Sequence, residues 1–185
     1  SPVLPQVDSV PVPGPGLDGP RSILCPMTDQ RRRHTAEQAA IRAIVEGPAT
    51  HTGERFFREL VRHLASALDV HGAWVTELVE DRGLLRSYAF WINGDWVEGY
   101  EYAIAGTPCE PVIGEDRLLL VPDRVIELFP RDHDLAEQGA VSYLGVPLHD
   151  TDGSILGHLA VLDKRPMPEH ERFTDLFRIF ANRAA

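Results

Sequence analysis

Two apolar runs joined by a short polar turn constrain this chain more than any other feature. Residues 141–163 read VSYLGVPLHDTDGSILGHLAVLD, with Asp150-Thr151-Asp152-Gly153 between the runs. Runs rich in β-branched and aromatic residues that flank an Asp-Gly turn are typical of a β-hairpin. Both runs carry apolar residues at alternating positions on both faces, so we expect both faces to be covered. The pattern predicts a hairpin at the centre of a sheet, with helices on one side and a second covering layer, where a ligand could sit, on the other.

Composition and charge narrow the class of protein. The chain has 185 residues, 43% of them hydrophobic, which suffices for one domain with extensions and a sizeable core. The formal net charge of -10 disfavours binding to nucleic acid or to an anionic membrane, because both need a basic surface. No run has the length of a transmembrane helix, and no signal peptide is visible. Cys25 and Cys109 lie far apart in the sequence, which indicates a reduced, cytoplasmic protein.

The first part of the chain differs in composition from the rest. Residues 1–20 hold six prolines and three glycines, so we expect residues 1–34 to be a disordered tail or linker. Residues 35–185 form the predicted domain. Because the chain begins with Ser1 and ends at Ala185 inside a helical pattern, we expect it to be part of a longer protein.

The remaining pattern predicts an α+β fold with a mainly antiparallel sheet. Helices are expected near both ends of the domain, at residues 36–46, 53–68 and from 169 to the end, and the last two carry one apolar face. Besides the closing hairpin, strands are expected at residues 73–80, 84–92 and 117–121. Residues 97–140 contain short helical turns and little periodicity, so we expect this segment to cover the face of the sheet opposite the helices. The phenylalanines of the last helix would form either a covering face or a dimer surface.

Several phrases, in order, resemble the GAF family. They are AGTPCEPV at residues 105–112, LFPRDHDLAEQGAVSYLGVPL at 128–148, and ILGHLAVLD at 155–163. They are similar to GAF domains of bacterial sensor kinases and transcriptional activators, and the resemblance covers about residues 35–185. It implies a six-stranded antiparallel sheet with terminal helices behind it and a small-molecule pocket at its front. It also implies an output domain in the same polypeptide and a homodimer formed through the terminal helices.

The predicted pocket lies on the face of the hairpin that carries Tyr143. Residues two apart on a strand share a face, so Gly145 and Pro147 lie on the same side as Tyr143. His158 and Ala160 share a face of the next strand, and small residues such as Gly145 and Ala160 would leave room for a ligand. The expected ligand-contacting residues are Trp74, Thr76, Phe90, Cys109, Asp123, Phe129, Tyr143, Gly145, Pro147, His158 and Ala160. The alternative is that these side chains simply fill the core.

Two polar residues of this group, His158 and Cys109, have more than one possible role. His158 is the polar residue in an apolar strand, and it could bind a ligand or make a structural hydrogen bond. Cys109 lies in the first turn of a predicted helix, a position that lowers the pKa of a thiol. This position permits redox sensing, a bilin thioether or catalysis as in GAF-fold methionine-sulfoxide reductases, but those reductases use several cysteines. The bilin-binding subgroup has His after its Cys, whereas this chain has Glu110. A packing cysteine is therefore favoured, and no bilin is predicted.

Other motifs indicate neither a metal site nor catalysis. Asp132-His133-Asp134 are adjacent, and no second His or Cys cluster is spaced to complete a metal site, so we expect one Asp to cap the next helix. Asp123 and Arg124 would border the pocket mouth or cap a turn. No Gly-rich phosphate loop, GxSxG or HExxH motif is present. The preferred function is a sensor module, with a ligand-free dimerisation module and a Cys-dependent reductase as alternatives.

Overall fold

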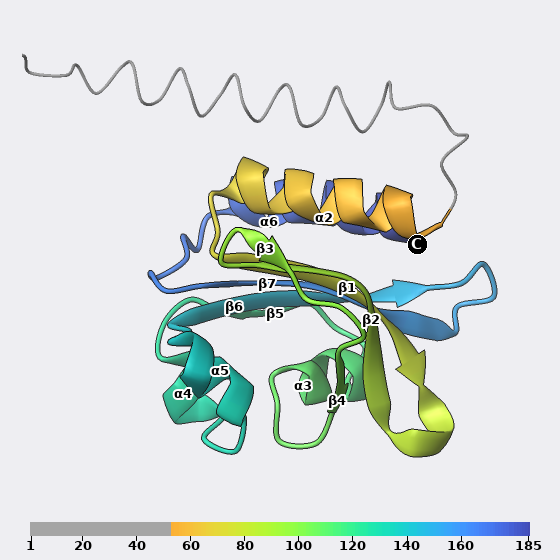
Figure 1. Cartoon of the computed structure of the whole chain (residues 1–185), viewed down its shortest axis with the longest axis horizontal. Helices are drawn as coiled ribbons and strands as arrows, with labels where there is room; N and C mark the ends of the chain where they lie inside the picture. The colour runs from red at the N-terminus through yellow and green to blue at the C-terminus, as the bar shows by residue number, and fades with distance from the viewer. Residues whose placement is uncertain (1–52) are drawn as a thin grey trace, which may run out of the picture.

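The computed structural model describes residues 53–185, and these residues form an antiparallel sheet covered on both faces (Figure 1). The expected helix at residues 36–46, the tail and the expected domain start at residue 35 lie outside the described residues. The sheet has seven strands in the order β3-β2-β1-β7-β6-β5, with β4 also paired to β2. The strands are β1 (Gly72–Val79), β2 (Leu84–Ile92), β3 (Asp95–Trp96), β4 (Glu101–Ala103), β5 (Leu119–Val121), β6 (Ser142–His149) and β7 (Ile155–Asp163).

The α+β class and the central position of the closing hairpin are confirmed. β6 and β7 pair with each other, and β5 and β1 flank them on either side. The sheet has one strand more than the six expected, because Asp95 and Trp96 turn back along the end of β2, where the sequence suggested only a turn. In the register of β6 and β7, the two small residues Gly145 and Ala160 lie opposite each other.

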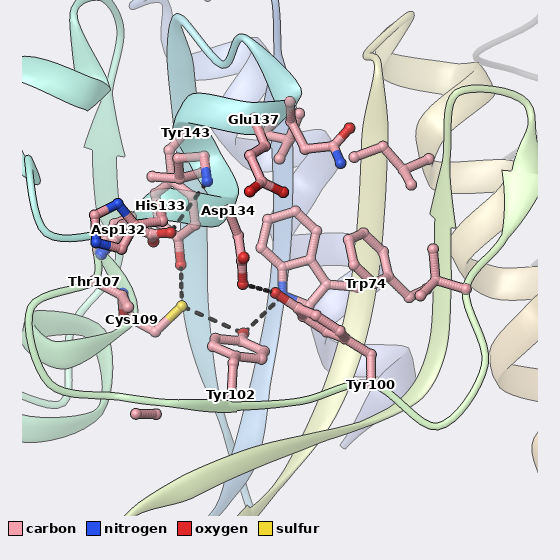
Figure 2. A pocket seen from close by; sticks show the side chains of 18 of the residues that line it. Trp74, Tyr100, Tyr102, Thr107, Cys109, Asp132, His133, Asp134, Glu137 and Tyr143 are labelled. Atoms are coloured by element: carbon pink, nitrogen blue, oxygen red, sulfur yellow. Dashed lines mark hydrogen bonds between the residues drawn. The ribbon is translucent and has the colours of Figure 1, made fainter.

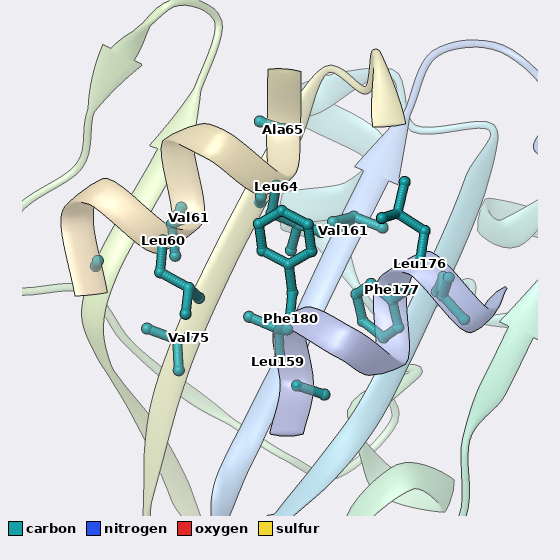
Figure 3. Packing of buried hydrophobic residues seen from close by; sticks show 14 of the residues in the cluster. Leu60, Val61, Leu64, Ala65, Val75, Leu159, Val161, Leu176, Phe177 and Phe180 are labelled. Carbon is teal, nitrogen blue, oxygen red and sulfur yellow. The ribbon is translucent and has the colours of Figure 1, made fainter. Parts of the chain in front are cut away.

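Two helices cover one face of the sheet. They are α2 (Glu54–Leu68) and α6 (Glu171–Ala184), which lie side by side in Figure 1. Figure 3 shows Leu64 of α2 and Phe177 and Phe180 of α6 packed over Val161 and Leu159 of β7. The phenylalanine stripe of the last helix is therefore a covering face. No helix among residues 53–185 is long and apolar enough to cross a membrane.

The segment from residue 97 to residue 140 covers the other face, as its lack of periodicity suggested. It contains the strands β4 and β5 and three short helices, α3 (Cys109–Gly114), α4 (Val125–Leu128) and α5 (His133–Gln138). The three helices lie on the opposite side of the sheet from α2 and α6 (Figure 1). Cys109, Val112, Val125 and Leu135 of these helices are buried in one cluster with the front of the sheet. The sheet thus has an apolar cluster on each face.

Candidate functional site

A cavity of about 360 Å³ lies between the front of the sheet and the covering segment. This volume falls within the range of small-molecule sites, roughly 300 to 1,000 Å³. Much of its wall is aromatic, and Figure 2 shows these side chains together with the polar residues around them. The aromatic residues are Trp74, Phe90, Tyr100, Tyr102 and Tyr143.

Three of these rings come from the sheet because strand residues alternate between its faces. Trp74 in β1, Phe90 in β2 and Tyr143 in β6 face the cavity, while their neighbours Val75 and Leu144 face the helices. The ring centroids of Trp74 and Phe90 are 5.2 Å apart, and those of Trp74 and Tyr143 are 6.1 Å apart. The strands therefore place three neighbouring aromatic rings at the floor of the cavity.

The other two tyrosines come from the covering segment. Tyr100 and Tyr102 lie two residues apart at β4, and their rings stack with centroids 5.2 Å apart. The indole N–H of Trp74 donates a hydrogen bond to the Tyr102 hydroxyl, with 3.0 Å between the heavy atoms. This bond ties the covering segment to the floor of the cavity.

A buried polar chain lies beneath the floor. His158 is fully buried, its Nδ1 lies 2.6 Å from Thr76 Oγ1, and its Nε2 lies 3.2 Å from Cys109 Sγ. Burial lowers the pKa of His158 to about 3, so the imidazole is neutral near neutral pH. A neutral ring has one donor and one acceptor nitrogen, and the two neighbours can satisfy both.

Cys109 is a buried thiol with a raised pKa. The Cys109 N–H donates to Thr107 Oγ1 at 3.2 Å, and the Gly106 N–H donates to Glu110 Oε2 at 2.7 Å, so two side chains bind backbone N–H groups at the start of α3. The expectation that the helix start lowers the thiol pKa is wrong. Cys109 is only 2% exposed, and burial raises its pKa despite hydrogen bonds from Tyr102 and Tyr143 that act the other way.

The rim of the cavity is acidic. Asp132, Asp134 and Glu137 of the α5 region line it, and Figure 2 shows the carboxylates of Asp134 and Glu137 on the side of Trp74 and Tyr100. Asp132 Oδ1 accepts a hydrogen bond from the Leu135 N–H at 3.1 Å. Asp132 is therefore the Asp that caps this helix, and the expected cap is confirmed. Burial raises the pKa of Asp132. The hydroxyl of Tyr100 donates to Asp134, and burial together with this bond raises the pKa of Tyr100.

Four of the eleven expected ligand-contacting residues line the cavity, namely Trp74, Phe90, Cys109 and Tyr143. Thr76, His158 and Ala160 are buried in the sheet and do not line it. Gly145 leaves room for the ring of Tyr143 and not for a ligand, since a Cβ at this position would lie 2.2 Å from the tyrosine oxygen.

The other three expected residues also lie away from the cavity wall. Pro147 pairs with His158 further along the hairpin. The exposed Asp123 caps a turn, where its Oδ1 accepts a hydrogen bond from the Arg124 N–H at 2.7 Å. Phe129 packs, half-buried, against the front cluster.

Apart from Cys109, the sequence did not identify the residues by which the covering segment lines the cavity. Tyr100 lies immediately before β4 and Tyr102 lies within it, and their spacing of two residues is a signal that could have identified them. The spacing of Asp134 and Glu137 at i and i+3 also places both on one side of a helix. Within residues 53–185, no three His, Cys, Asp or Glu side chains lie close enough together to hold a metal ion.

The fold and the cavity together define an α+β domain whose sheet is covered on both faces, with a ligand-sized space under its front cover. The family model of the GAF domain matches residues 52–185, and the chain belongs to this family. GAF domains are regulatory or sensor modules of signalling proteins and are generally not catalytic. No curated protein matches the chain at a significant level.

Solved structures of GAF domains share this fold. The GAF domain of a phosphoenolpyruvate-protein phosphotransferase from Coxiella burnetii has a TM-score of 0.67 and 16% identity, covering 80% of this chain and 89% of that chain. The nlh2 GAF domain of A. aeolicus, in an inactive state, has a TM-score of 0.60 and 11% identity, with 84% and 94% covered. The chromophore-binding domain of a bacteriophytochrome from R. palustris has a TM-score of 0.61 and 9% identity, with 83% and 60% covered. At these identities the likeness concerns the fold alone.

Proposed function

We propose that this domain is a regulatory sensor module of a bacterial cytoplasmic signalling protein, and that it binds a small molecule in the front cavity. The observation that carries the proposal is the cavity of about 360 Å³ with its aromatic wall. An apolar, largely preformed pocket with a few convergent polar groups is typical of small-molecule sites. Membership of a family of sensor modules supports the same function.

The covering segment is the element that a ligand would bias. Tyr100, Tyr102 and Cys109 contribute to the cavity from this segment, while Trp74 and Tyr143 contribute from the sheet. A ligand that contacts both the covering segment and the sheet favours a state in which the two lie together over a state in which they lie apart. The size of this shift depends on the difference in its affinity for the two states. The opposite face of the same strands packs against α2 and α6. We propose that this packing passes the change to an output domain, and that the terminal helices also form a homodimer.

A thermal-shift screen of the full chain against a panel of metabolites tests ligand binding. At a concentration of about 100 times Kd, a ligand adds about 2.7 kcal/mol to the free energy of unfolding, so Tm rises by several degrees. Ala105→Trp places an indole at the cavity and should abolish the shift, whereas Ala136→Trp introduces the same side chain at an exposed helix position outside it. If no metabolite raises the Tm of the wild type, the sensor proposal fails.

One observation favours a ligand-free structural module as a second candidate. The polar side chains beneath the cavity floor already pair with one another, through Thr76, His158 and Cys109, and leave no unsatisfied group among them. A structural module needs no ligand to complete such a core. In the same screen this candidate predicts an unchanged Tm for the wild type, together with a dimer in solution.

A further inference from the structure

The wall of the cavity combines aromatic rings with carboxylates. We propose that the ligand is an organic cation that carries an alkylated ammonium group, an inference that rests on the ligand-binding function proposed above. The face of an aromatic ring is electronegative and attracts such a cation, most strongly when the site excludes water. A carboxylate supplies the balancing charge.

The rings surround the cavity from both layers. Trp74 and Phe90 belong to the sheet, and Tyr100 belongs to the covering segment. The ring centroid of Tyr100 is 5.3 Å from that of Phe90 and 5.2 Å from that of Tyr102. Trp74 is only 5% exposed, so its environment is largely free of solvent. An alkylated ammonium group can bury its methyl groups against these rings and keep its favourable electrostatic interaction with them.

The charges at the cavity have the sign that a cation requires. The lining holds the three carboxylates of Asp132, Asp134 and Glu137 against the single guanidinium of Arg131, which gives a formal charge of -2 when histidine is left out of the count. The side chain of Arg131 lies against Gly106, where a Cβ would be 3.0 Å from its Nε. An anionic ligand would have to lose its hydration beside these carboxylates, which is unfavourable.

Glu137 is the carboxylate that can bind a ligand without giving up a hydrogen bond within the fold. Asp132 caps α5 and Asp134 accepts the hydroxyl of Tyr100, whereas Glu137 has no hydrogen-bond or ion-pair partner among residues 53–185. Glu137 lines the same cavity as Trp74 and Tyr100, and Figure 2 shows its carboxylate on the side of the cavity where Trp74 lies. The geometry therefore assigns the ammonium group to the space between Glu137, Trp74 and Tyr100.

Calorimetric titration of the full chain with choline, benzyltrimethylammonium, 3,3-dimethylbutan-1-ol and benzoate tests the charge preference. The alcohol is the neutral carbon analogue of choline. We expect at least one of the two cations to bind, choline about tenfold or more tighter than the alcohol, and benzoate not to bind, in keeping with cation–π energies at desolvated sites.

Variants test the placement of the ammonium group. Glu137→Gln should weaken binding of the cation about threefold or more, while Glu80→Gln, the same charge change at the β1–β2 turn, should leave it unchanged. Tyr100→Leu should weaken binding about twofold to thirtyfold, whereas Tyr100→Phe, which keeps the ring, should have a smaller effect.

The outcomes separate this inference from the sensor proposal. Equal binding of choline and the alcohol, tighter binding of benzoate, or no binding of either cation overturns the preference for a cation. If a neutral or anionic metabolite then stabilises the wild type but not Ala105→Trp, ligand binding in the cavity stands and only the cation is wrong. An unchanged affinity in both Glu137→Gln and Tyr100→Leu would overturn the assigned position.

Discussion

His158 Nε2 lies 3.2 Å from Cys109 Sγ, so a side chain at the centre of the sheet meets the first turn of α3. Thr76 Oγ1 lies 2.6 Å from the other ring nitrogen, which completes a buried polar chain from β1 through β7 to the covering segment. Buried polar groups that pair with each other fix the relative positions of the elements that carry them. The chain of contacts therefore sets where the covering segment sits on the sheet.

The pKa of His158 predicts a specific loss of stability in acid. Because the folded-state pKa is about 3 and the ordinary value is 6.5, the unfolded state takes up a proton below pH 6.5 that the folded state does not. This group therefore lowers the free energy of unfolding by about 1.4 kcal/mol per pH unit as the pH falls from about 6 toward 3.

Replacing the histidine isolates this contribution. His158→Gln should be less stable than the wild type at neutral pH, because it disrupts the bonds to Thr76 and Cys109. The difference in the free energy of unfolding between the two proteins should shrink by about 2 kcal/mol between pH about 6.5 and about 4.5 in urea unfolding experiments. Only the wild type has a histidine that takes up its proton on unfolding. Parallel stability curves for the two proteins would contradict a neutral, buried His158.

The Cys109 thiol is expected to react slowly. Burial raises its pKa above the ordinary value of 9.0, so little thiolate exists near neutral pH. The rate of alkylation by iodoacetamide, measured against pH in a Cys25→Ser background, should reach half its maximum above pH 9.0. The urea-unfolded protein provides the control, with an ordinary thiol. A half-maximum below pH 9.0 in the folded protein would show that α3 activates the thiol after all.

Gly145 is required by the ring of Tyr143. A Cβ at this position would lie 2.2 Å from the Tyr143 hydroxyl oxygen, so Gly145→Ala must displace a fully buried ring that lines the cavity. Overpacking of this kind costs about 1 to 3 kcal/mol of stability, measurable by urea unfolding. Gly114→Ala is the matched control, because nothing lies within 4 Å of its added Cβ. Equal stabilities of the two variants would contradict this packing.

Phe177 and Ile179 of α6 form a matched pair of residues that tests whether the last helix covers the sheet. Phe177 is fully buried against the sheet, whereas Ile179 on the same helix is 42% exposed. Phe177→Ala should lower the free energy of unfolding by about 3 to 5 kcal/mol, and Ile179→Ala by less than about 1 kcal/mol. A larger loss for Ile179→Ala, dependent on protein concentration, would instead indicate that the exposed side of α6 is an interface between two copies of the chain.

The sheet and its helices could be predicted because their signals are local. The alternation along β6 and β7 and the apolar face of α2 each report burial directly. The front cover has no such period, so the sequence placed residues 97–140 over the sheet without giving their contacts. The two-residue strand β3 was missed because so short a pairing depends on its neighbour β2 and not on its own sequence.

Three of the four predicted residues that line the cavity follow from the strand pattern, and the fourth, Cys109, lies in α3. Trp74, Phe90 and Tyr143 were found because alternation assigns them to the front face. The prediction that Gly145 leaves room for a ligand was wrong, because the side chain of Tyr143 fills that space. The rotamer of Tyr143 cannot be read from the sequence. The reversed pKa shift of Cys109 follows from the tertiary burial of α3, which a local helix-start signal does not contain.

The indole resonances of the three tryptophans give the most direct test of ligand binding in the front cavity. Trp74 lines the cavity, whereas Trp91 and Trp96 pack on the helix-covered face of the sheet. In ¹H–¹⁵N spectra of the full chain, titration with a metabolite that raises Tm should shift the indole N–H of Trp74 and leave the other two nearly unchanged. Shifts confined to Trp91 and Trp96, or no shift at any indole, would contradict binding in this cavity.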